Sequence, residues 1–209
     1  MKPVSLIETL RYEPGTGFRN LDRHRARMAA SAEALGLGFD PDRFEEKLNE
    51  VPEEEGPRRV RLELGSQGRL TLTHAGFVPA GEGTVWTVRI ARTAALSSQD
   101  PLLRHKTGRR GHYDAARSEF GLAEADEVLL LNERGEVCEG TITSLFLPDG
   151  RGGFLTPSLA CGLLAGVERQ RLLDAGHAAE AVIRPEDLAG RDFFVGNSLR
   201  GLIPARLLP

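Results

Sequence analysis

Lysine is rare in this chain, and one lysine lies where its amine could act as a nucleophile. The 27 Lys and Arg residues include only three lysines, Lys2, Lys47 and Lys106. Lys106 lies within the segment Arg104–Arg110, where arginines surround it. Neighbouring cations lower the pKa of a lysine, and the neutral amine is a nucleophile that arginine does not supply. Lys106 is therefore a candidate for covalent catalysis, and a solvated basic loop is the alternative interpretation.

A carboxylate and a glycine-bearing loop are the next candidates. Glu139 stands between Cys138 and Gly140 in strand-like sequence rather than in a run of charges. Gly140 permits a bulge or a close approach of the backbone to a ligand. The segment Gly162–Arg169 has the pattern of a loop that opens a helix, where N–H groups and the helix dipole favour an anion. The alternatives are a turn carboxylate and an ordinary helix start.

Two further polar features add to this set. Arg27, within His24–Met28, projects from the polar edge of a predicted helix and is a candidate phosphate clamp. The segment Gly196–Gly201 is a small polar turn after a hydrophobic strand, which suits contact with a ligand through N–H and hydroxyl groups. A solvated arginine and a plain loop are the alternatives.

Composition excludes several classes of protein. The 27 basic and 30 acidic residues give a net charge of −3, which argues against a nucleic-acid partner. A hydrophobic content of 40% is enough for a core, and no apolar run approaches the ~18–20 residues of a membrane span. The two cysteines, Cys138 and Cys161, have neither metal-type nor redox-type spacing, so we expect a reduced, cytoplasmic protein.

Several catalytic signatures are missing from the sequence. The five histidines and two cysteines show no metal-ligand spacing, so we expect no metal site. A Gly-x-Ser-x-Gly elbow, typical of one class of serine hydrolase, is absent, and so is the Gly-x-Gly-x-x-Gly fingerprint of dinucleotide folds.

The elements that must position these residues are mixed helices and strands. Hydrophobic periodicity predicts helices over 19–37, 41–51, 112–120 and 166–175. Alternation and turn residues predict strands over 6–12, 59–64, 69–74, 84–92, 126–132, 137–139, 141–147, 154–156, 179–183 and 192–197. This order indicates an α+β protein. We expect a smaller N-terminal domain over 1–95, a linker over 96–103, and a larger C-terminal domain over 104–209.

Taken in order, these motifs resemble one known family, the class IV aminotransferases, which are pyridoxal-phosphate enzymes of fold type IV. The family includes branched-chain and D-amino-acid aminotransferases and 4-amino-4-deoxychorismate lyase. The motifs are Ile7–Arg11, His24–Met28 with Ser31–Ala32, His105–Thr107, Asp126–Asn132 leading to Glu139–Gly140, Thr156–Pro157 with Gly162–Arg169, and Asn197–Gly201. The resemblance implies a two-domain fold like that of D-amino-acid aminotransferase, with Lys106 carried by the larger domain.

The resemblance also assigns cofactor roles by position. Lys106 matches the lysine that holds pyridoxal 5′-phosphate covalently, and Glu139 matches the acid that keeps the pyridine nitrogen protonated. Arg27 matches the arginine on the phosphate. The remaining matches are Val167 and Glu168, as backbone donors to the phosphate, and Asn197 and Ser198, as the turn near phosphate and substrate.

On the substrate side, the chain is most similar to the lyase members. Thr9 falls where these carry a threonine beside the substrate, and Lys106 is expected to act as the general base. Arg61 and Arg200 are candidates to hold a substrate carboxylate, from charge type alone. The resemblance thus implies a lyase that releases pyruvate and forms 4-aminobenzoate for folate synthesis, acting on a small amino substrate as a homodimer.

Departures from the family pattern keep two other functions open. The chain starts after the family's usual opening strands, Arg109-Arg110 replace Asn-Arg, Ser144 replaces Asn, and Ala165 replaces Pro. One alternative is an aminotransferase acting on branched-chain or D-amino acids. The other is an inactive homologue, or a partner protein, that binds the cofactor without turnover.

Overall fold

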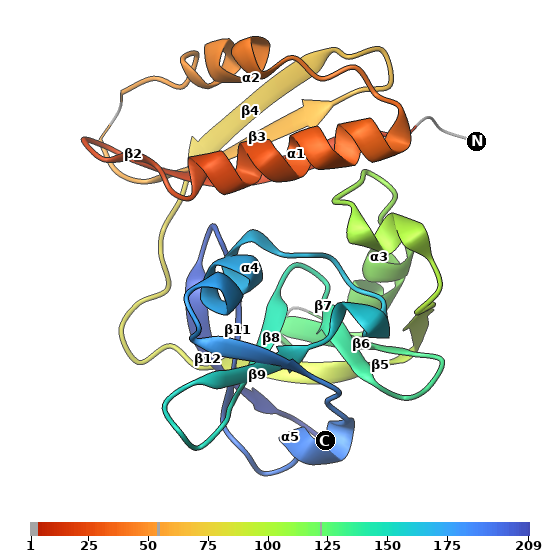
Figure 1. The fold of residues 1–209 in the computed structure, drawn as a ribbon. Coiled ribbons are helices and arrows are strands. Elements are labelled where there is room, and N and C mark those ends of the chain that lie inside the picture. Colours follow the sequence, from red (N-terminus) through yellow and green to blue (C-terminus); the bar gives the residue numbers. More distant parts are fainter. Residues whose placement is uncertain (1–3, 54, 122) are drawn as a thin grey trace. The chain divides into compact units, whose positions relative to one another are not determined.

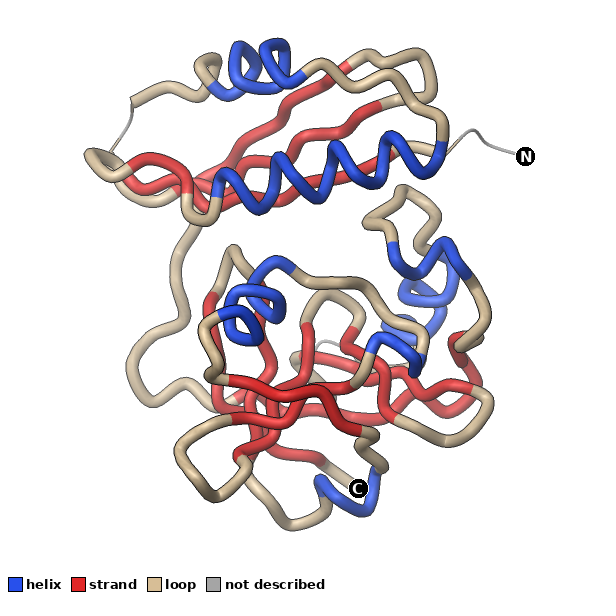
Figure 2. Tube along the Cα trace, viewed as in Figure 1, coloured by secondary structure: helices blue, strands red, loops and turns tan. Residues whose placement is uncertain are grey.

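Two separate β-sheets organise the chain (Figure 1). In the computed structural model, which describes residues 4–53, 55–121 and 123–209, one sheet has four strands and the other has eight. Each sheet lies in its own unit. The first unit runs to Pro79 and includes His105–Arg109, and the second comprises Ala80–Arg104 and Arg110–Pro209. Figure 2 shows the mixture of helices and strands, which confirms the α+β class.

The sheet of the first unit is antiparallel, with strand order β2-β1-β3-β4. Its strands are β1 (Leu6–Glu13), β2 (Gly17–Phe18), β3 (Arg58–Leu64) and β4 (Leu70–Gly76). Along β3 the side chains alternate between buried and more exposed positions, as the sequence pattern predicts for a strand with one face on a core. The buried face includes Leu6, Leu10, Val60 and Leu62.

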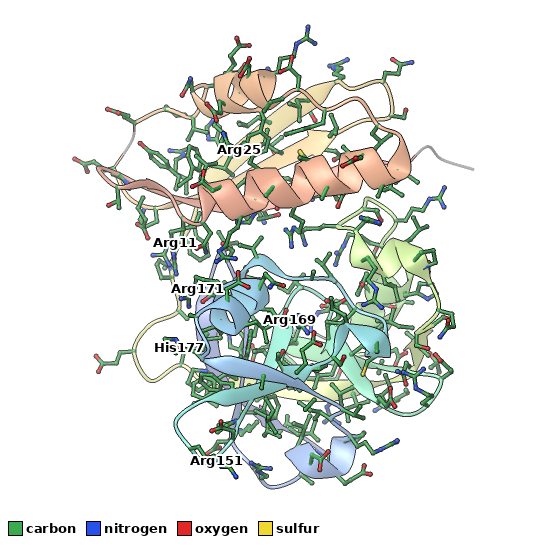
Figure 3. All side chains as sticks on the ribbon, in the orientation of Figure 1. Arg11, Arg25, Arg151, Arg169, Arg171 and His177 are labelled. Atoms are coloured by element: carbon green, nitrogen blue, oxygen red, sulfur yellow. The ribbon has the colours of Figure 1, made fainter. Side chains whose placement is uncertain are left out.

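Two helices pack against that face, and their ends follow from local sequence. Helix α1 (Leu21–Leu35) ends at Gly36, which adopts the left-handed conformation that glycine tolerates best. Helix α2 (Pro41–Leu48) starts at Asp40, whose carboxylate accepts hydrogen bonds from the backbone N–H groups of the first turn. Arg25 of α1, labelled in Figure 3, forms an ion pair with Glu45 of α2.

The sheet of the second unit is mixed, with strand order β10-β9-β8-β11-β12-β5-β6-β7. Three pairs of neighbours, β10–β9, β12–β5 and β5–β6, are parallel, and the others described are antiparallel. The strands are β5 (Trp86–Leu96), β6 (Glu127–Asn132), β7 (Val137–Gly140), β8 (Ser144–Pro148), β9 (Phe154–Pro157), β10 (Ala178–Ala181), β11 (Phe193–Asn197) and β12 (Gly201–Leu207).

The helices of this unit pack on different strands. Helix α3 (Gly111–Ser118) contacts β5 and β6, and α4 (Val167–Asp174) contacts β10 and β11. Short helical turns occur at η1 (Pro101–Arg104), η2 (Leu159–Cys161) and α5 (Pro185–Leu188). Arg169 of α4 lies in the interior of this unit, where it donates to the Pro157 carbonyl (2.7 Å) and pairs with Glu180 (Figure 3).

The boundary between the units differs from the one expected from sequence. Strand β5 belongs to the second unit, so the chain changes unit near residue 80 rather than over 96–103. The segment His105–Arg109, which carries Lys106, returns to the first unit. Local alternation identified β5 as a strand, but its partners β6 and β12 are distant in sequence, and periodicity holds no information about such pairing. No helix in the described part of the chain is long and apolar enough to cross a membrane.

Candidate active site

Lys106 lies in a segment that pairs with the start of β1. The Lys106 carbonyl accepts a hydrogen bond from the Ile7 N–H (2.8 Å), and the Gly108 N–H donates to the Ser5 carbonyl (2.9 Å). Thr107 forms an antiparallel bridge with Leu6. These bonds fix the backbone on both sides of Lys106, so the position of its Cα is well defined.

A histidine and a glycine add to this attachment. The ring of His105 contacts the Ser31 hydroxyl of α1 through Nδ1 (2.9 Å), and burial lowers the pKa of His105. A Cβ on Gly108 would come within 2.5 Å of the Ser5 hydroxyl, so a side chain at this position would have to displace that hydroxyl. The segment is therefore attached both to the sheet and to α1 of the first unit.

Arg27 is held by a carboxylate that our sequence analysis did not select. Glu8 of β1 is buried, and Arg27 grips it in a bidentate ion pair, with Nε to Oε1 at 2.8 Å and Nη2 to Oε2 at 2.6 Å. The His24 ring, one turn earlier on α1, also contacts Glu8 Oε2 (2.6 Å). A bidentate pair fixes the plane of a guanidinium group, so Glu8 sets the orientation of Arg27.

The electrostatics of Glu8 follow from these partners. Burial by itself would raise the pKa of Glu8, but the charge of Arg27 and the hydrogen bonds from His24 and Arg27 outweigh it and lower the pKa to about 2. The carboxylate is therefore ionised throughout the physiological range. The sequence held a signal for the burial of Glu8, because strand alternation places it on the same face as Leu6 and Leu10, but none for its pairing with Arg27.

Thr9 and Arg61 are direct neighbours across β1 and β3. Both point away from the buried face, since the residues on either side of each are buried. The Arg61 guanidinium donates to Glu63 (3.1 Å) on the same strand, and Glu63 also accepts from the Ser5 hydroxyl (2.6 Å). This face of the first sheet thus brings together a hydroxyl, a guanidinium and a carboxylate.

Glu139 lies at the end of β7 in the second unit and is only 5% exposed. Its Oε1 accepts a hydrogen bond from the Tyr113 hydroxyl of α3 (2.7 Å) and another from the Leu164 N–H (3.1 Å). Both donors are neutral groups. These two donors orient the carboxylate.

The turn after Glu139 is organised by a second buried carboxylate. Glu127 of β6 accepts hydrogen bonds from the Thr141 N–H (3.0 Å), the Ile142 N–H (3.2 Å) and the Thr143 hydroxyl (2.7 Å). A Cβ on Gly140 would come within 2.7 Å of the Glu127 carboxyl. The glycine therefore allows this turn to close around Glu127, whereas the sequence suggested a bulge or a close approach to a ligand at this position.

Helix α4 begins where the glycine loop predicted. Gly166 is its N-cap, no side chain of the described residues caps this end, and Val167 and Glu168 lie in the first turn. A Cβ on Gly166 would come within 2.7 Å of the Ser144 hydroxyl, which is part of the turn held by Glu127. The Glu168 carboxylate is bound by Arg171 (2.7 Å), so its charge is compensated within the helix.

The last predicted site segment is the turn between β11 and β12. The Asn197 amide donates to the Ile142 carbonyl (3.0 Å) and its Oδ1 accepts from the Arg200 N–H (2.9 Å), while Ser198 is buried. The Arg200 guanidinium stacks over the Trp86 ring at 5.8 Å. Asn197 therefore ties this turn to the turn that follows Glu139.

The candidate residues thus form one group in each unit. The first unit holds Lys106 with Thr9, Arg27 and Arg61. The second unit holds Glu139 with Val167, Glu168, Asn197, Ser198 and Arg200. Sequence analysis missed the residues that orient these groups, which are Glu8, His24, Tyr113 and Glu127. Among the described residues, no three His, Cys, Asp or Glu side chains are grouped to hold a metal ion.

Known proteins resemble this chain over nearly its whole length. A solved structure from Mesorhizobium loti, a "Putative amino-acid aminotransferase", is 50% identical, covers 98% of this chain and 100% of its own, and superposes with a TM-score of 0.95. A curated "Putative aminodeoxychorismate lyase" from Schizosaccharomyces pombe is 32% identical over 96% of this chain and 88% of its own. The structure of 4-amino-4-deoxychorismate lyase from Pseudomonas aeruginosa is 25% identical, with a TM-score of 0.79 over 98% of this chain and 83% of its own.

A family model identifies what these relatives share. The model described as amino-transferase class IV matches residues 5–208, and the family depends on pyridoxal phosphate. The match confirms the family expected from the sequence motifs. The chain is an enzyme that belongs to the class IV aminotransferases.

Proposed function

We propose that this protein is a pyridoxal-phosphate-dependent lyase that acts on 4-amino-4-deoxychorismate, releasing pyruvate and 4-aminobenzoate. The observation that carries the proposal is the pairing of Thr9 with Arg61 on one face of the first sheet. A lyase of this kind must bind a carboxylate and orient a leaving enol oxygen, and a guanidinium and a hydroxyl supply those two functions. The fission-yeast relative adds support through its name.

The residues present fit the cofactor. The uncapped start of α4 at Gly166, where a Cβ would collide with Ser144, leaves backbone N–H groups for a phosphate. The Glu139 carboxylate, oriented by neutral donors, suits a protonated pyridine nitrogen. Lys106 would hold the cofactor, Arg27 would bind its phosphate together with the Val167 and Glu168 N–H groups, and Asn197 and Ser198 would line the same end.

The bound cofactor withdraws electrons from the carbon that carries the substrate amine, which makes its proton acidic. The Lys106 amine then removes this proton as the general base. Glu139 holds the proton on the ring nitrogen. The Thr9 hydroxyl orients the leaving oxygen, while Arg61, or Arg200, binds a substrate carboxylate.

An amino-acid aminotransferase is the second candidate, because the 50% identical Mesorhizobium relative carries that name. The same lysine would move a proton between two carbons instead of eliminating a leaving group. The substrates would be branched-chain or D-amino acids, as proposed from the sequence resemblance.

One pair of assays separates these functions. The protein is incubated with pyridoxal phosphate and 4-amino-4-deoxychorismate without any 2-oxo acid, and pyruvate and 4-aminobenzoate are measured. The proposal predicts equal amounts of both products. No pyruvate here, together with transfer of an amino group from an amino acid to 2-oxoglutarate, would establish the aminotransferase. Binding without either reaction would indicate an inactive homologue.

We also propose that the protein is a cytoplasmic homodimer. Light scattering measures the molar mass of the assembly.

A further inference from the structure

The hydroxyl of Tyr113 is placed against the acid that is proposed to face the cofactor ring. Tyr113 lies on α3 and donates to Glu139 Oε1 over 2.7 Å. Its ring is mostly withdrawn from solvent. A buried tyrosine hydroxyl needs a partner, but any carbonyl would satisfy it. Its pairing with a carboxylate at the end of β7 therefore indicates a role beyond satisfying the hydroxyl.

A second donor converges on the same oxygen from another element. The Leu164 N–H, in the loop before α4, donates to Glu139 Oε1 over 3.1 Å. Two donors on one oxygen restrict its position more than a single hydrogen bond would. The orientation of Glu139 therefore depends on both α3 and the loop that leads to Gly166.

The start of α3 is itself bound to the turn after Glu139. The Arg110 guanidinium stacks on the Tyr113 ring at 5.0 Å and donates through Nη2 to the Thr141 carbonyl (2.7 Å). Arg110 also approaches Asp114 one turn later, at 3.8 Å. Arg110 thus holds the Tyr113 ring and also contacts the turn after Glu139. This contact helps to direct the Tyr113 hydroxyl at Glu139.

We propose that Tyr113 is a positioning residue for Glu139, whose hydroxyl fixes Oε1 so that the carboxylate keeps the orientation needed to hold a proton on the cofactor ring nitrogen. This inference rests on the proposed function. A purely structural role would be the filling of space between α3 and β7. The two roles differ in one respect, because only positioning depends on the ring nitrogen of the cofactor.

The chemistry of Tyr113 is compatible with this role. Burial, followed by the neighbouring negative charge of Glu139, raises the pKa of Tyr113 far above its ordinary value of 10.0. The phenol therefore keeps its proton and remains a donor at every working pH. Phenylalanine in its place preserves the ring, the Arg110 stack and the packing, and removes only the donated hydrogen bond.

The test compares two probes in the wild type and in Tyr113→Phe. One probe is pyridoxal phosphate, and the other is its deaza analogue, in which a C–H replaces the ring nitrogen. We expect Tyr113→Phe to weaken binding of pyridoxal phosphate about 3–10-fold, the range that follows from one hydrogen bond, and to leave binding of the analogue unchanged. Tyr12→Phe, which alters the chain's other tyrosine, is the matched control and should change neither affinity.

Two further variants isolate the route through Glu139. In Glu139→Gln the added Tyr113→Phe change should have little further effect on binding of pyridoxal phosphate, because the two residues act through one contact. A full further loss on adding Tyr113→Phe to Glu139→Gln would show that Tyr113 acts by another route and would overturn the inference.

The other outcomes are also decisive. Equal weakening for both probes would assign Tyr113 to packing alone, and unchanged binding of both would remove any role for it; either result overturns the inference while the proposed function stands. Failure of the wild type to take up pyridoxal phosphate would overturn the proposed function and this inference with it.

Discussion

Two buried carboxylates, Glu8 and Glu139, meet different surroundings, and the difference indicates different roles. Glu8 forms an ion pair with the Arg27 guanidinium and contacts the His24 ring, so its charge is balanced within the protein. Glu139 accepts from the neutral Tyr113 hydroxyl and the Leu164 N–H. Glu8 therefore holds an arginine in place, whereas the Tyr113 hydroxyl and the Leu164 N–H fix the orientation of Glu139, the acid proposed to face the cofactor.

Replacing Glu8 with glutamine tests its structural role. Loss of one partner of a buried ion pair costs about 3–5 kcal/mol, so Glu8→Gln should lower the free energy of unfolding of the first unit by roughly that amount at pH 7. Far-ultraviolet circular dichroism in urea measures this. The chain's one tryptophan, Trp86, lies in the second unit and would report on that unit instead.

The same variant has a pH signature. Because the pKa of Glu8 falls from 4.5 to about 2 on folding, its stabilisation is complete above pH 4.5 and is lost as the pH falls towards 2. The stability difference between wild type and Glu8→Gln should therefore shrink over that interval. Glu45→Gln is the control, because the exposed Arg25–Glu45 pair is expected to contribute less than about 1 kcal/mol. A difference that stays constant from pH 7 to pH 3 would contradict the assignment.

Glu139→Gln tests the catalytic role of the second carboxylate. The amide keeps the shape but not the charge, so turnover should fall roughly 10²–10³-fold, the usual effect of removing one electrostatic partner of a reacting group. The initial rate of product formation measures this, with cofactor content determined on the same sample. A rate within threefold of wild type, at full cofactor content, would exclude Glu139 as the ring-nitrogen acid.

At the scale of elements, the turn over residues 140–144 connects several parts of the second unit. Glu127 binds it from β6, Arg110 from the start of α3, and Asn197 from the end of β11. Ser144, its last residue, lies against Gly166 at the start of α4. The placement of Glu139 and that of the proposed phosphate-binding end of α4 therefore both depend on this turn.

Gly140→Ala tests whether the turn requires a residue without a side chain at position 140. The added Cβ would meet the Glu127 carboxyl and the Thr143 hydroxyl, and we expect a loss of about 1–3 kcal/mol in stability together with weaker cofactor binding. Gly38→Ala is the control, because nothing lies within 4 Å of a Cβ at that position. Thermal unfolding of both variants measures the difference, and equal midpoints would contradict the tight closure of the turn.

Sequence reasoning succeeded where the determinants of an element are local. The helices predicted over 19–37 and 41–51 and the strands predicted over 59–64 and 69–74 correspond to α1, α2, β3 and β4, whose ends and pairing depend on capping, turn residues and alternation. Strand β12 was not predicted, and Pro204 within it interrupts the usual strand pattern. The side-chain contacts Tyr113–Glu139 and Arg27–Glu8 join residues 26 and 19 positions apart, and no spacing rule links such pairs.

For the whole molecule, the sequence predicted two domains but did not reveal the boundary between them. The strands that determine it, β5 with β6 and β12, pair in parallel across long stretches of chain. The order and spacing of the motifs nevertheless identified the family, because order along the chain does not depend on the unit to which each motif belongs. Lys106 was expected in the larger domain and lies in a segment of the first unit.

Binding of the cofactor should stabilise the protein as a whole. At a concentration 100-fold above the dissociation constant a ligand adds about 2.7 kcal/mol, which corresponds to a rise of roughly 5–10 °C in the melting temperature for a chain of this size. Differential scanning fluorimetry with and without pyridoxal phosphate measures this rise. Pyridoxine, which has neither the phosphate nor the aldehyde, is the control ligand and should give no shift.

The most direct test of the central claim is to find the residue that carries the cofactor. The protein is incubated with pyridoxal phosphate, reduced with borohydride to fix the covalent link, digested, and analysed by mass spectrometry. We predict the label on Lys106 and its loss in Lys106→Ala, with Lys47→Ala as the control that keeps it. Label on Lys47 or Lys2 at equal yield, or no label on Lys106, would contradict the account.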